Sequence, residues 1–548
     1  MVRRKIGAPP IAGQYRLGGQ IAVTRALVAL SAVAALLLGS GPRTAPMPDG
    51  PTLIGGPVAW LLSSSADLGS ARIGRAQLAV ALQNTARPQA LIEWASRHDL
   101  SLRWRPGDAW GYLEGVPGNI AAAFGVPVHD YRRRSGQVFY ASAWQPAVPA
   151  PVRGEVAALG HILSYNSRHL ATPANLPRDV PKDGLTPDGL LTTYNAEPLK
   201  MAGFTGKGQT IVFFEIDGYN QADLDSFAAL SGLPPLTPLL IGGQPGPSEG
   251  ETEMDLEVAH AIAPEAQLVV MNAYAAQGNS NYDEAANMFT AADRQFPGAV
   301  WSSSIGVGCD RMTTAADLAP AQSALVAAEA HGTSAFDASG DTGGLECKEY
   351  NGDWSTPPGE SDRGLDSLAS LPAMTDVGGT TLSTDANGVW LAEETWVDSP
   401  MSQGTGGGVS ALFSRPAWQK GVSSPDDTTH RLTPDVAADA DPYTGVRILE
   451  GGQVVAGGGT SQSAPIWAGM AVLMNQFLVA HGGHILGDLN PLLYRVAAAA
   501  ARPAFHDVAL GGNVVATAAS GYDLTTGLGT PDVDNLVHDL LDLQLGSR

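Results

Sequence analysis

After Gly208 the chain alternates short apolar runs with stretches of helical composition, and this alternation constrains the fold more than any other feature. The runs QTIVFFEID, AQLVVMNAY, GAVWSSSIG and GTSAFDASGD are typical of strands buried on both faces. Between them, NYDEAANMFTAADRQF and ADLAPAQSALVAAEAH are typical of helices. This order predicts an α/β fold, in which helices flank a parallel sheet and the chemistry lies at the carboxyl ends of its strands.

A smaller unit precedes this region. Residues Gln77–Asn84 are expected to form a strand and Pro88–Asp99 a helix, and LRWR, WGYLEGV, GNIAAAFG and VPVHDYRRR continue a β-α-β-β-α-β order. We therefore expect a small α+β ferredoxin-like domain over residues 60–160, called the front domain below. Residues 161–190 are rich in Pro, Asn, Arg and Ser and predict an exposed linker open to cleavage. Residues 191–545, the main domain, carry the parallel sheet.

The first 40 residues have the pattern of a targeting segment. Five arginines and lysines precede or begin the apolar run Ala26–Gly39, and small and Pro-rich residues follow it. That run of 14 residues is shorter than the roughly 20 that cross a bilayer. A cleaved signal peptide and an uncleaved membrane anchor both remain open, and each predicts export. The two cysteines, Cys309 and Cys347, would fit one disulfide in an oxidising compartment or two buried thiols.

Charge is unevenly distributed along the chain. The net charge of −22 argues against a nucleic acid or an anionic membrane surface as a partner. Residues 1–190 hold 19 Lys and Arg against 11 Asp and Glu, a balance of +8, which leaves −30 for the remainder. A basic front part beside a strongly acidic rear part suggests that one binds the other.

The segment GGGTSQSAP, Gly457–Pro465, places a serine on a glycine-rich turn at the start of an apolar helix. The free N–H groups and dipole of a helix start favour an anion, which suits both an activated Ser461 oxygen and a tetrahedral oxyanion. Ser461 is therefore a candidate nucleophile. The alternative is that Ser461 only caps the helix.

A serine nucleophile normally needs a histidine base, and the histidines of this chain are poorly placed for that role. His260 lies among apolar helix positions in EVAHAIAPEAQ, where it is expected to be a core or edge residue, and His331 precedes a strand in HGTSAF. An HGTH segment, as in subtilisin-like enzymes, is absent.

The segment GETEMDLEVAHAIAPEAQ offers a carboxyl base instead. Glu251 and Asp255 are four residues apart, so on a helix they share a face. Two carboxyls held close cannot both ionise easily, and one pKa rises. At acidic pH Glu251 could then act as the base. The alternative is a solvated acidic helix start, which we expect for Glu253 and Glu257.

An ordered set of motifs carries a family resemblance: GETEMDLEVAHAIAP, SAFDASGDTGG, TGGGVSALFSRPAWQ, RLTPDVAADADPYTG, GGGTSQSAP, and FHDV followed by GYDLTTGLGTP. In these motifs the chain resembles the sedolisin family of serine-carboxyl peptidases, and the front domain resembles that family's activation propeptide. The resemblance implies a subtilisin-like sheet and matches Ser461 to the nucleophile, Glu251 to the general base and acid, and Asp255 to the carboxylate that orients it.

The resemblance also matches Asp341, in ASGDTGG, to an oxyanion aspartate, since a neutral carboxylic acid can donate a hydrogen bond to the oxyanion. The alternative is a turn without a mechanistic role. Glu215 matches an outer carboxylate, but Ile305 stands where some relatives carry the tryptophan of that network. Asp366 falls near a position that can carry a substrate-pocket carboxylate.

A calcium site is predicted near the C-terminus. Carboxylates and carbonyls of a glycine-rich turn supply the hard oxygen ligands that Ca²⁺ prefers. By resemblance one structural ion would be bound by Asp507, the carbonyls of Val508, Ala519 and Gly521, and Asp523. The alternative is a polar loop of Asx turns.

These observations predict a secreted zymogen of an acid-acting endopeptidase that cleaves protein or peptide substrates as a monomer. Its own propeptide would inhibit it until cleavage in the linker. Two rival hypotheses are a subtilisin-type neutral peptidase that uses His260 and an inactive, surface-attached binding protein built on a peptidase scaffold.

Overall fold

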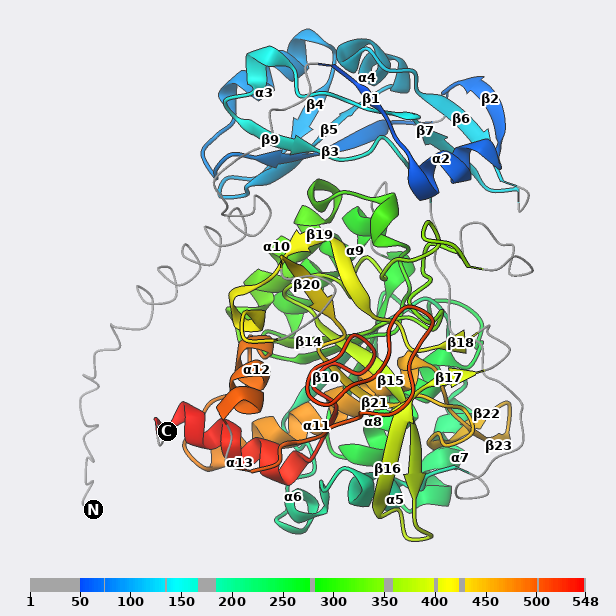
Figure 1. The fold of residues 1–548 in the computed structure, drawn as a ribbon, viewed down its shortest axis with the longest axis vertical. Coiled ribbons are helices and arrows are strands. Elements are labelled where there is room, and N and C mark those ends of the chain that lie inside the picture. The colour runs from blue at the N-terminus through cyan, green and yellow to red at the C-terminus, as the bar shows by residue number, and fades with distance from the viewer. Residues whose placement is uncertain are drawn as a thin grey trace, which may run out of the picture.

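The front domain is built around a four-stranded antiparallel sheet in the order β4-β5-β3-β9 (Figure 1). The computed structural model describes residues 50–546 apart from 73, 134–135, 166–183, 276–280, 349–357, 399–402, 423–428 and 500–501. The predicted targeting segment and most of the predicted linker therefore lie outside the described residues. The elements of this sheet and its helices are β3 (Ala76–Leu82), α3 (Gln89–Arg97), β4 (Ser101–Arg103), β5 (Trp110–Gly115), α4 (Pro117–Phe124) and β9 (Val156–Leu159).

The segment VPVHDYRRR, expected to be the last strand of this sheet, belongs to a different one. Its strand β6 (His129–Arg132) pairs with β2 (Ala66–Ser70) and β7 (Val138–Ala141) in a three-stranded antiparallel sheet. The fourth position of the main front sheet is taken by β9, which pairs with β3. Strand β9 has only four residues and follows a Pro-rich stretch, so no strand pattern marks it in the sequence. The remaining elements here are β1 (Thr52–Leu53), α2 (Gly56–Ser63), β8 (Trp144–Gln145) and η1 (Ala150–Val152).

The main domain contains an eight-stranded sheet in the order β11-β12-β10-β13-β14-β15-β16, with β21 also paired to β15. All pairs are parallel except β15 with β16. This confirms the predicted subtilisin-like parallel sheet. The strands are β10 (Thr210–Glu215), β11 (Leu239–Ile241), β12 (Gln267–Asn272), β13 (Val300–Ser303), β14 (Ser334–Ala338), β15 (Thr375–Thr384), β16 (Trp390–Thr395) and β21 (Val436–Asp439).

Helices cover both faces of this sheet, and the side chains of each strand alternate between two apolar cores. Ile211 and Phe213 of β10 lie in one core with helices α8 and α11, whereas Val212 and Phe214 lie in the other with α9 and α10. Burial on both faces explains why these strands are continuously apolar. The covering helices are α8 (Glu251–Ile262), α9 (Asn281–Gln295), α10 (Ala315–Glu329) and α11 (Thr460–Ala480).

Smaller elements complete the main domain, most of them in its second half. Helix α11 is the described helix that is long and apolar enough to cross a membrane, but 83% of its most apolar stretch is buried in the protein, as in the core helix of a soluble domain. The other elements are α5 (Pro187–Thr193), α6 (Glu197–Met201), α7 (Gln221–Ser231), η2 (Ala273–Ala275), η3 (Asp310–Met312), β17 (Val397–Asp398), β18 (Gln403–Gly404), β19 (Gly408–Ser414), η4 (Ala417–Gln419), β20 (His430–Thr433), β22 (Arg447–Glu450), β23 (Gln453–Ala456), α12 (Asn490–Ala499), β24 (Phe505–His506), β25 (Thr530–Pro531) and α13 (Val533–Gln544).

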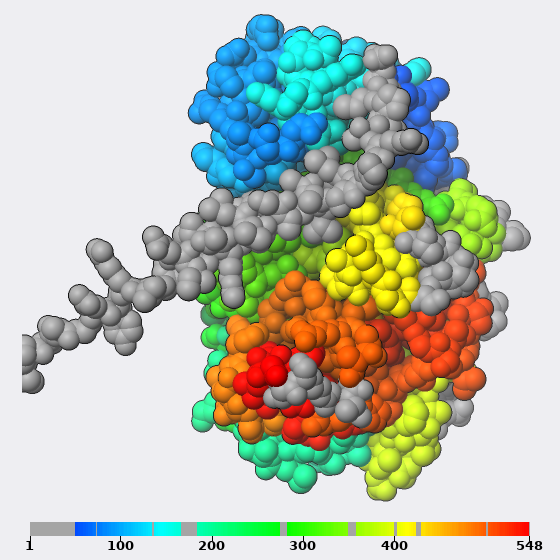
Figure 2. All heavy atoms as spheres, turned by 60° about the vertical axis from the view of Figure 1, so that its left-hand side comes forward, coloured from blue at the N-terminus to red at the C-terminus, as the bar shows by residue number. Residues whose placement is uncertain are grey.

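The front sheet packs its helix-free face on the main domain, above helices α9 and α10 (Figure 1). Figure 2 shows the front domain seated on the main domain. Ala79 and Tyr112 on that face share an apolar cluster with Ala319 of α10. Arg103 of β4 forms an ion pair of 2.9 Å with the buried Asp283 of α9. The side chain of Asp317 completes a capping box at the start of α10 and also accepts a hydrogen bond of 3.0 Å from the backbone N–H of residue 161.

A buried ion pair supports the second half of the main domain. The Arg431 guanidinium bonds both carboxylate oxygens of Asp435 at 2.9 and 2.7 Å, and neither side chain is exposed. The same guanidinium donates to the carbonyls of Ser370 and Met374. This pair joins strand β20 to the loops that precede strand β15.

Replacing Arg431 by Met should lower the free energy of unfolding of the main domain by about 3–5 kcal/mol, because Asp435 would remain as a buried, unpaired charge. Urea unfolding followed by tryptophan fluorescence measures this loss. The control is Lys200→Met, which breaks the exposed pair of Lys200 with Asp188 and should cost less than about 1 kcal/mol. Equal losses in the two variants would contradict this interpretation.

Candidate active site

Ser461 is the second residue of helix α11 and is only 3% exposed. The residue that caps the helix is Gly459, with a φ of 80°, and no side chain forms a cap there. Helix capping therefore does not explain Ser461. The glycine run is needed because a Cβ at Gly458 would lie 2.5 Å from Pro442. The Ser461 side chain lies near Glu251 of the neighbouring helix α8, close enough for its hydroxyl to lower the pKa of that carboxyl.

Helix α8 begins at Glu251, directly after Gly250, which has a φ of 102°. One turn further on, the Oδ2 atom of Asp255 accepts a hydrogen bond of 2.9 Å from Ser304. Glu251 and Asp255 therefore lie on one face of α8, as their spacing predicts. The start of the helix is held by Asp217, whose carboxylate accepts hydrogen bonds from the backbone N–H groups of residues 249 and 252.

Burial determines the ionisation of these carboxyls. It raises the pKa of Glu251 well above its ordinary value, and the charge of Asp255 raises it further, whereas the Ser461 hydrogen bond lowers it. Burial likewise raises the pKa of Asp255, against the lowering effect of the Ser304 hydrogen bond. Because the two carboxyls repel each other's ionised form, they share protons as a pair. Such a pair can hold one carboxylate and one carboxylic acid in acidic solution.

Asp341 lies at the start of helix α11, in the turn after strand β14. Its Oδ1 atom accepts hydrogen bonds of 2.8 Å from both the backbone N–H and the hydroxyl of Thr460. The Thr460 hydroxyl in turn accepts a hydrogen bond from the N–H of Gly340. Asp341 is also close enough for its charge to raise the pKa of Glu251. The structure therefore brings Ser461, Glu251, Asp255 and Asp341 into one site.

Ser304 is a contributor that the sequence analysis missed. It follows strand β13, and its hydroxyl bonds both Asp255 and, at 3.3 Å, the backbone carbonyl of Ser461. It links the carboxyl pair to the helix that carries the serine. A polar residue directly after a buried strand is the signal that could have identified it.

Other acidic residues of α8 correct the expectation of a solvated helix start. Glu253 and Glu257 are fully buried. Glu253 accepts hydrogen bonds of 2.6 Å from the N–H of Asn220 and the hydroxyl of Ser248, and Glu257 accepts one of 2.6 Å from the N–H of Leu449. All twelve residues of the helix are buried, because helices α5, α7 and α11 and strand β22 pack around it.

The histidines are placed as core or surface residues. The Nε2 atom of His260 lies 2.8 Å from the carbonyl of Pro234, and burial lowers the pKa of His260. His260 is nine residues along α8 from Glu251, or about 13 Å at the rise of a helix. His331 is exposed and pairs with Asp293 at 2.8 Å. Neither arrangement gives Ser461 an imidazole base.

Glu215 ends strand β10 inside the same acidic cluster. Burial raises its pKa well above the ordinary value, and the charges of Asp255 and Asp217 add to this effect. Ile305 lies in the apolar core on the α9 and α10 side. An isoleucine side chain has no N–H to donate, so the network expected around a tryptophan does not form at this position.

Asp366, expected near a substrate pocket, is buried and bonded to backbone groups through both carboxylate oxygens. Its Oδ2 atom accepts hydrogen bonds from the N–H groups of Val307 and Gly308 at 2.7 and 3.2 Å. Its Oδ1 atom accepts from the N–H groups of residues 368 and 369. With 2% exposure and four backbone donors, Asp366 braces two loops, which argues against the substrate-binding role.

Of the predicted calcium ligands, the structure brings the carboxylates of Asp507 and Asp523 to the turn that contains Ala519 and Gly521. Asp507 accepts hydrogen bonds from the N–H of Gly521 and the hydroxyl of Ser520, and Asp523 accepts one from the N–H of Ala519. The Asp523 carboxylate also forms an Asx turn with the N–H of Thr525. Together these contacts place two carboxylates near one turn, a donor set that fits Ca²⁺. Among the described residues, the group of three acidic, cysteine or histidine side chains close enough to share an ion is Cys309, Asp310 and Cys347, whose sulfurs form a disulfide.

Known proteins resemble the chain over most of its length, although no family model matches it. Kumamolisin from Bacillus sp. (strain MN-32) is 29% identical over 486 residues, which cover 82% of each protein. Sedolisin from Pseudomonas sp. (strain 101) is 29% identical over 77% of this chain and 73% of its own. The solved structure of Pseudomonas sedolisin with two molecules of pseudo-iodotyrostatin gives a TM-score of 0.56 at 28% identity, over 65% of this chain and 97% of that one.

The parallel sheet, the clustered serine and carboxyls, and these likenesses identify the class as serine-carboxyl peptidases. The chain is similar to peptidases of the sedolisin family over most of its length, and it is a serine-type peptidase.

The buried carboxyl of Glu257 gives a test of the acidic helix that is independent of catalysis. Burial raises the pKa of Glu257 to about 9. Between the ordinary pKa of a glutamate and this raised pKa, the folded state therefore binds more protons than the unfolded state. The contribution of the protonated Glu257 carboxyl to the free energy of unfolding is therefore complete at low pH and is lost as the pH rises towards 9. Glu257→Gln should be about as stable as the parent at pH ~4 and more stable at pH ~8.

Urea unfolding across this pH range measures the difference. The matched control is Glu249→Gln, an exposed position just before the helix, which should leave the pH dependence unchanged. A Glu257→Gln variant with the same pH dependence as the parent would contradict the raised pKa.

Proposed function

We propose that the protein is an endopeptidase that works at acidic pH through an acyl-enzyme on Ser461. The observation that carries this proposal is the contact between the Ser461 hydroxyl and Glu251, with Asp255 on the same helix face. Glu251 would accept the Ser461 proton as the hydroxyl oxygen bonds the substrate carbonyl carbon. Glu251 would then protonate the leaving amine, and a water molecule would repeat the sequence to release the acyl group.

Asp341 would stabilise the oxyanion of each tetrahedral intermediate. Its Oδ1 atom is engaged by Thr460, so a proton on Oδ2 could be donated to the developing negative charge. The N–H of Ser461, one of the first in its helix, has no partner within the helix and would be the second donor. An ionised Asp341 would repel the oxyanion, so this role requires acidic conditions.

We also propose that the front domain keeps the enzyme inactive until acid releases it. Its basic charge faces an acidic main domain, and Asp283 and Asp317 both take part in the contact. Burial raises the pKa of Asp317, and protonation of this carboxyl would weaken the hydrogen bond from residue 161. Cleavage in the linker would make the release permanent. The N-terminal apolar run and the joined cysteines support export of the protein.

Ser461→Ala should stop self-cleavage, so the purified full-length chain should persist at pH ~4 while the parent shortens. Intact masses measure this. In an assay on a denatured protein, Glu251→Gln should lower kcat by about a thousandfold or more, since no other base in the described part of the chain contacts Ser461.

The control is His260→Gln, which keeps a donor for the Pro234 carbonyl and should retain most activity. Activity of the parent should fall towards neutral pH as the carboxyls ionise. A His260→Gln variant as inactive as Glu251→Gln, or a parent fully active above pH ~7, would favour the subtilisin-type mechanism instead.

We propose one structural Ca²⁺ at the turn formed by Asp507, the carbonyls of Val508, Ala519 and Gly521, and Asp523. The ion would be held by hard oxygen donors and would fix the turn to the preceding strand β24. It would not take part in the chemistry.

Calcium should then raise the thermal unfolding midpoint of the parent by about 5 °C relative to chelator at pH ~6. Asp507→Asn should remove this increase, although its side-chain oxygen can still accept from Gly521. The matched control is Asp385→Asn, in an exposed turn with similar backbone hydrogen bonds, which should keep the response. No response of the parent to calcium would refute the site.

A further inference from the structure

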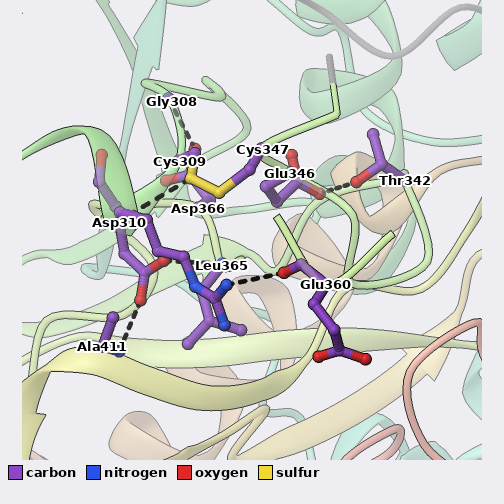
Figure 3. Close-up of a disulfide and its surroundings, with 12 residues drawn as sticks. Gly308, Cys309, Asp310, Thr342, Glu346, Cys347, Glu360, Leu365, Asp366 and Ala411 are labelled. Carbon is purple, nitrogen blue, oxygen red and sulfur yellow. Dashed lines mark hydrogen bonds between the residues drawn. A yellow bond between two sulfur atoms is a disulfide. The ribbon is translucent and has the colours of Figure 1, made fainter. Parts of the chain in front are cut away.

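The Cys309–Cys347 disulfide (Figure 3) joins the loop that follows strand β13 to the loop that follows strand β14. Cys309 follows Ser304 by five residues, and Cys347 follows Asp341 by six. The bond therefore ties the loop that orients the carboxyl pair to the loop that carries the proposed oxyanion aspartate.

Short contacts connect each cysteine to its side of the site. Next to Cys347, the buried Glu346 accepts a hydrogen bond of 2.5 Å from the hydroxyl of Thr342, which directly follows Asp341 (Figure 3). Glu346 also lies against Gly340, where a Cβ would approach its carboxylate to 2.2 Å. On the other side, the residues between Ser304 and Cys309 are held by the backbone hydrogen bonds of Asp366.

The front domain covers this disulfide. Cys309 is fully buried and Cys347 is 3% exposed. Both belong to an apolar cluster whose other members, apart from Met312, come from the front domain, including Leu61 of α2 and Phe139 of β7. Helix α2 packs against η3, the short helix that follows Cys309. The sulfurs are therefore shielded by a domain that the proposed maturation removes.

We propose that this disulfide is a clamp that positions the Asp341 loop, and that the front domain protects the clamp from reduction. The positioning role rests on the proposed function, whereas the protection does not. Reduction by a phosphine would supply two electrons: the S–S bond breaks, each sulfur takes up a proton, and the phosphine becomes its oxide with oxygen from water. The mature enzyme would then lose activity in a reducing environment that leaves the zymogen intact.

Protection is tested on the full-length Ser461→Ala chain, treated with a water-soluble phosphine and an alkylating agent. Mass spectrometry follows the labelling, which is specific because the chain has two cysteines. Leu61→Asp should speed labelling of both cysteines by at least about tenfold, since it opens the apolar cover. The control Leu68→Asp, at an exposed site of the same domain, should not. Rapid labelling of the Ser461→Ala chain, or equally slow labelling of Leu61→Asp, would overturn the protection.

A second variant tests the protection without changing a residue of the apolar cluster around the disulfide. Gly160→Ala places a Cβ 1.9 Å from the Oδ1 atom of Asp317 and should push the front domain away without touching the cysteines' neighbours. It should also speed labelling. Labelling of this variant as slow as that of the Ser461→Ala chain would contradict protection of the disulfide by the front domain.

Positioning is tested on the acid-matured enzyme. Phosphine treatment should lower kcat per titrated active site by about tenfold or more with little change in KM, because a displaced Asp341 affects the transition state and not substrate binding. Reoxidation should restore kcat. A merely stabilising disulfide would lower the unfolding temperature and leave kcat per active site unchanged, and that outcome would overturn the clamp. If Ser461→Ala proves active, the proposed function fails, but the labelling result still stands.

Discussion

The structure depends on the burial of carboxyl groups where the starts of two core helices meet. Helix α8 presents Glu251 and Asp255, and helix α11 presents Ser461, at the carboxyl edge of the parallel sheet. Taking these acids out of water favours their protonated forms, so the groups can share and pass protons in acidic solution. An imidazole is unnecessary under such conditions. The surrounding fold supplies what this arrangement requires: glycine turns for close approach, hydroxyl groups to orient the acids, and loops that exclude solvent.

The sequence predicts the overall scaffold because its strongest signals are local and periodic. Strands buried on both faces are continuously apolar, and the glycine-rich turn before Ser461 marks a helix start. Other features depend on contacts between distant segments. Strand β9 is too short to have a pattern, and Asp366 finds its donors among backbone groups. Glu253 and Glu257 are buried because distant elements, among them α7 and β22, pack around α8. Ser304 could have been inferred from its position after β13, but its partners come from two other helices.

The two domains are complementary in shape as well as in charge. A ferredoxin-like sheet has one face without helices, and here that face is closed by α10 of the main domain. The same junction holds a partly exposed ion pair, a capping carboxylate and a buried disulfide. Covering the enzyme and completing the core of the front domain are therefore one event, and each domain contributes to the burial of the other's apolar surface.

The contact of Asp317 with residues 160 and 161 has a consequence for how the sequence can vary. The main domain binds this segment of the chain through the backbone N–H of residue 161, a group that every residue type except proline provides. Side chains near this contact can change over evolutionary time without loss of the hydrogen bond. Glycine at 160 cannot, because the close approach of the carboxylate leaves no room for even one methyl group.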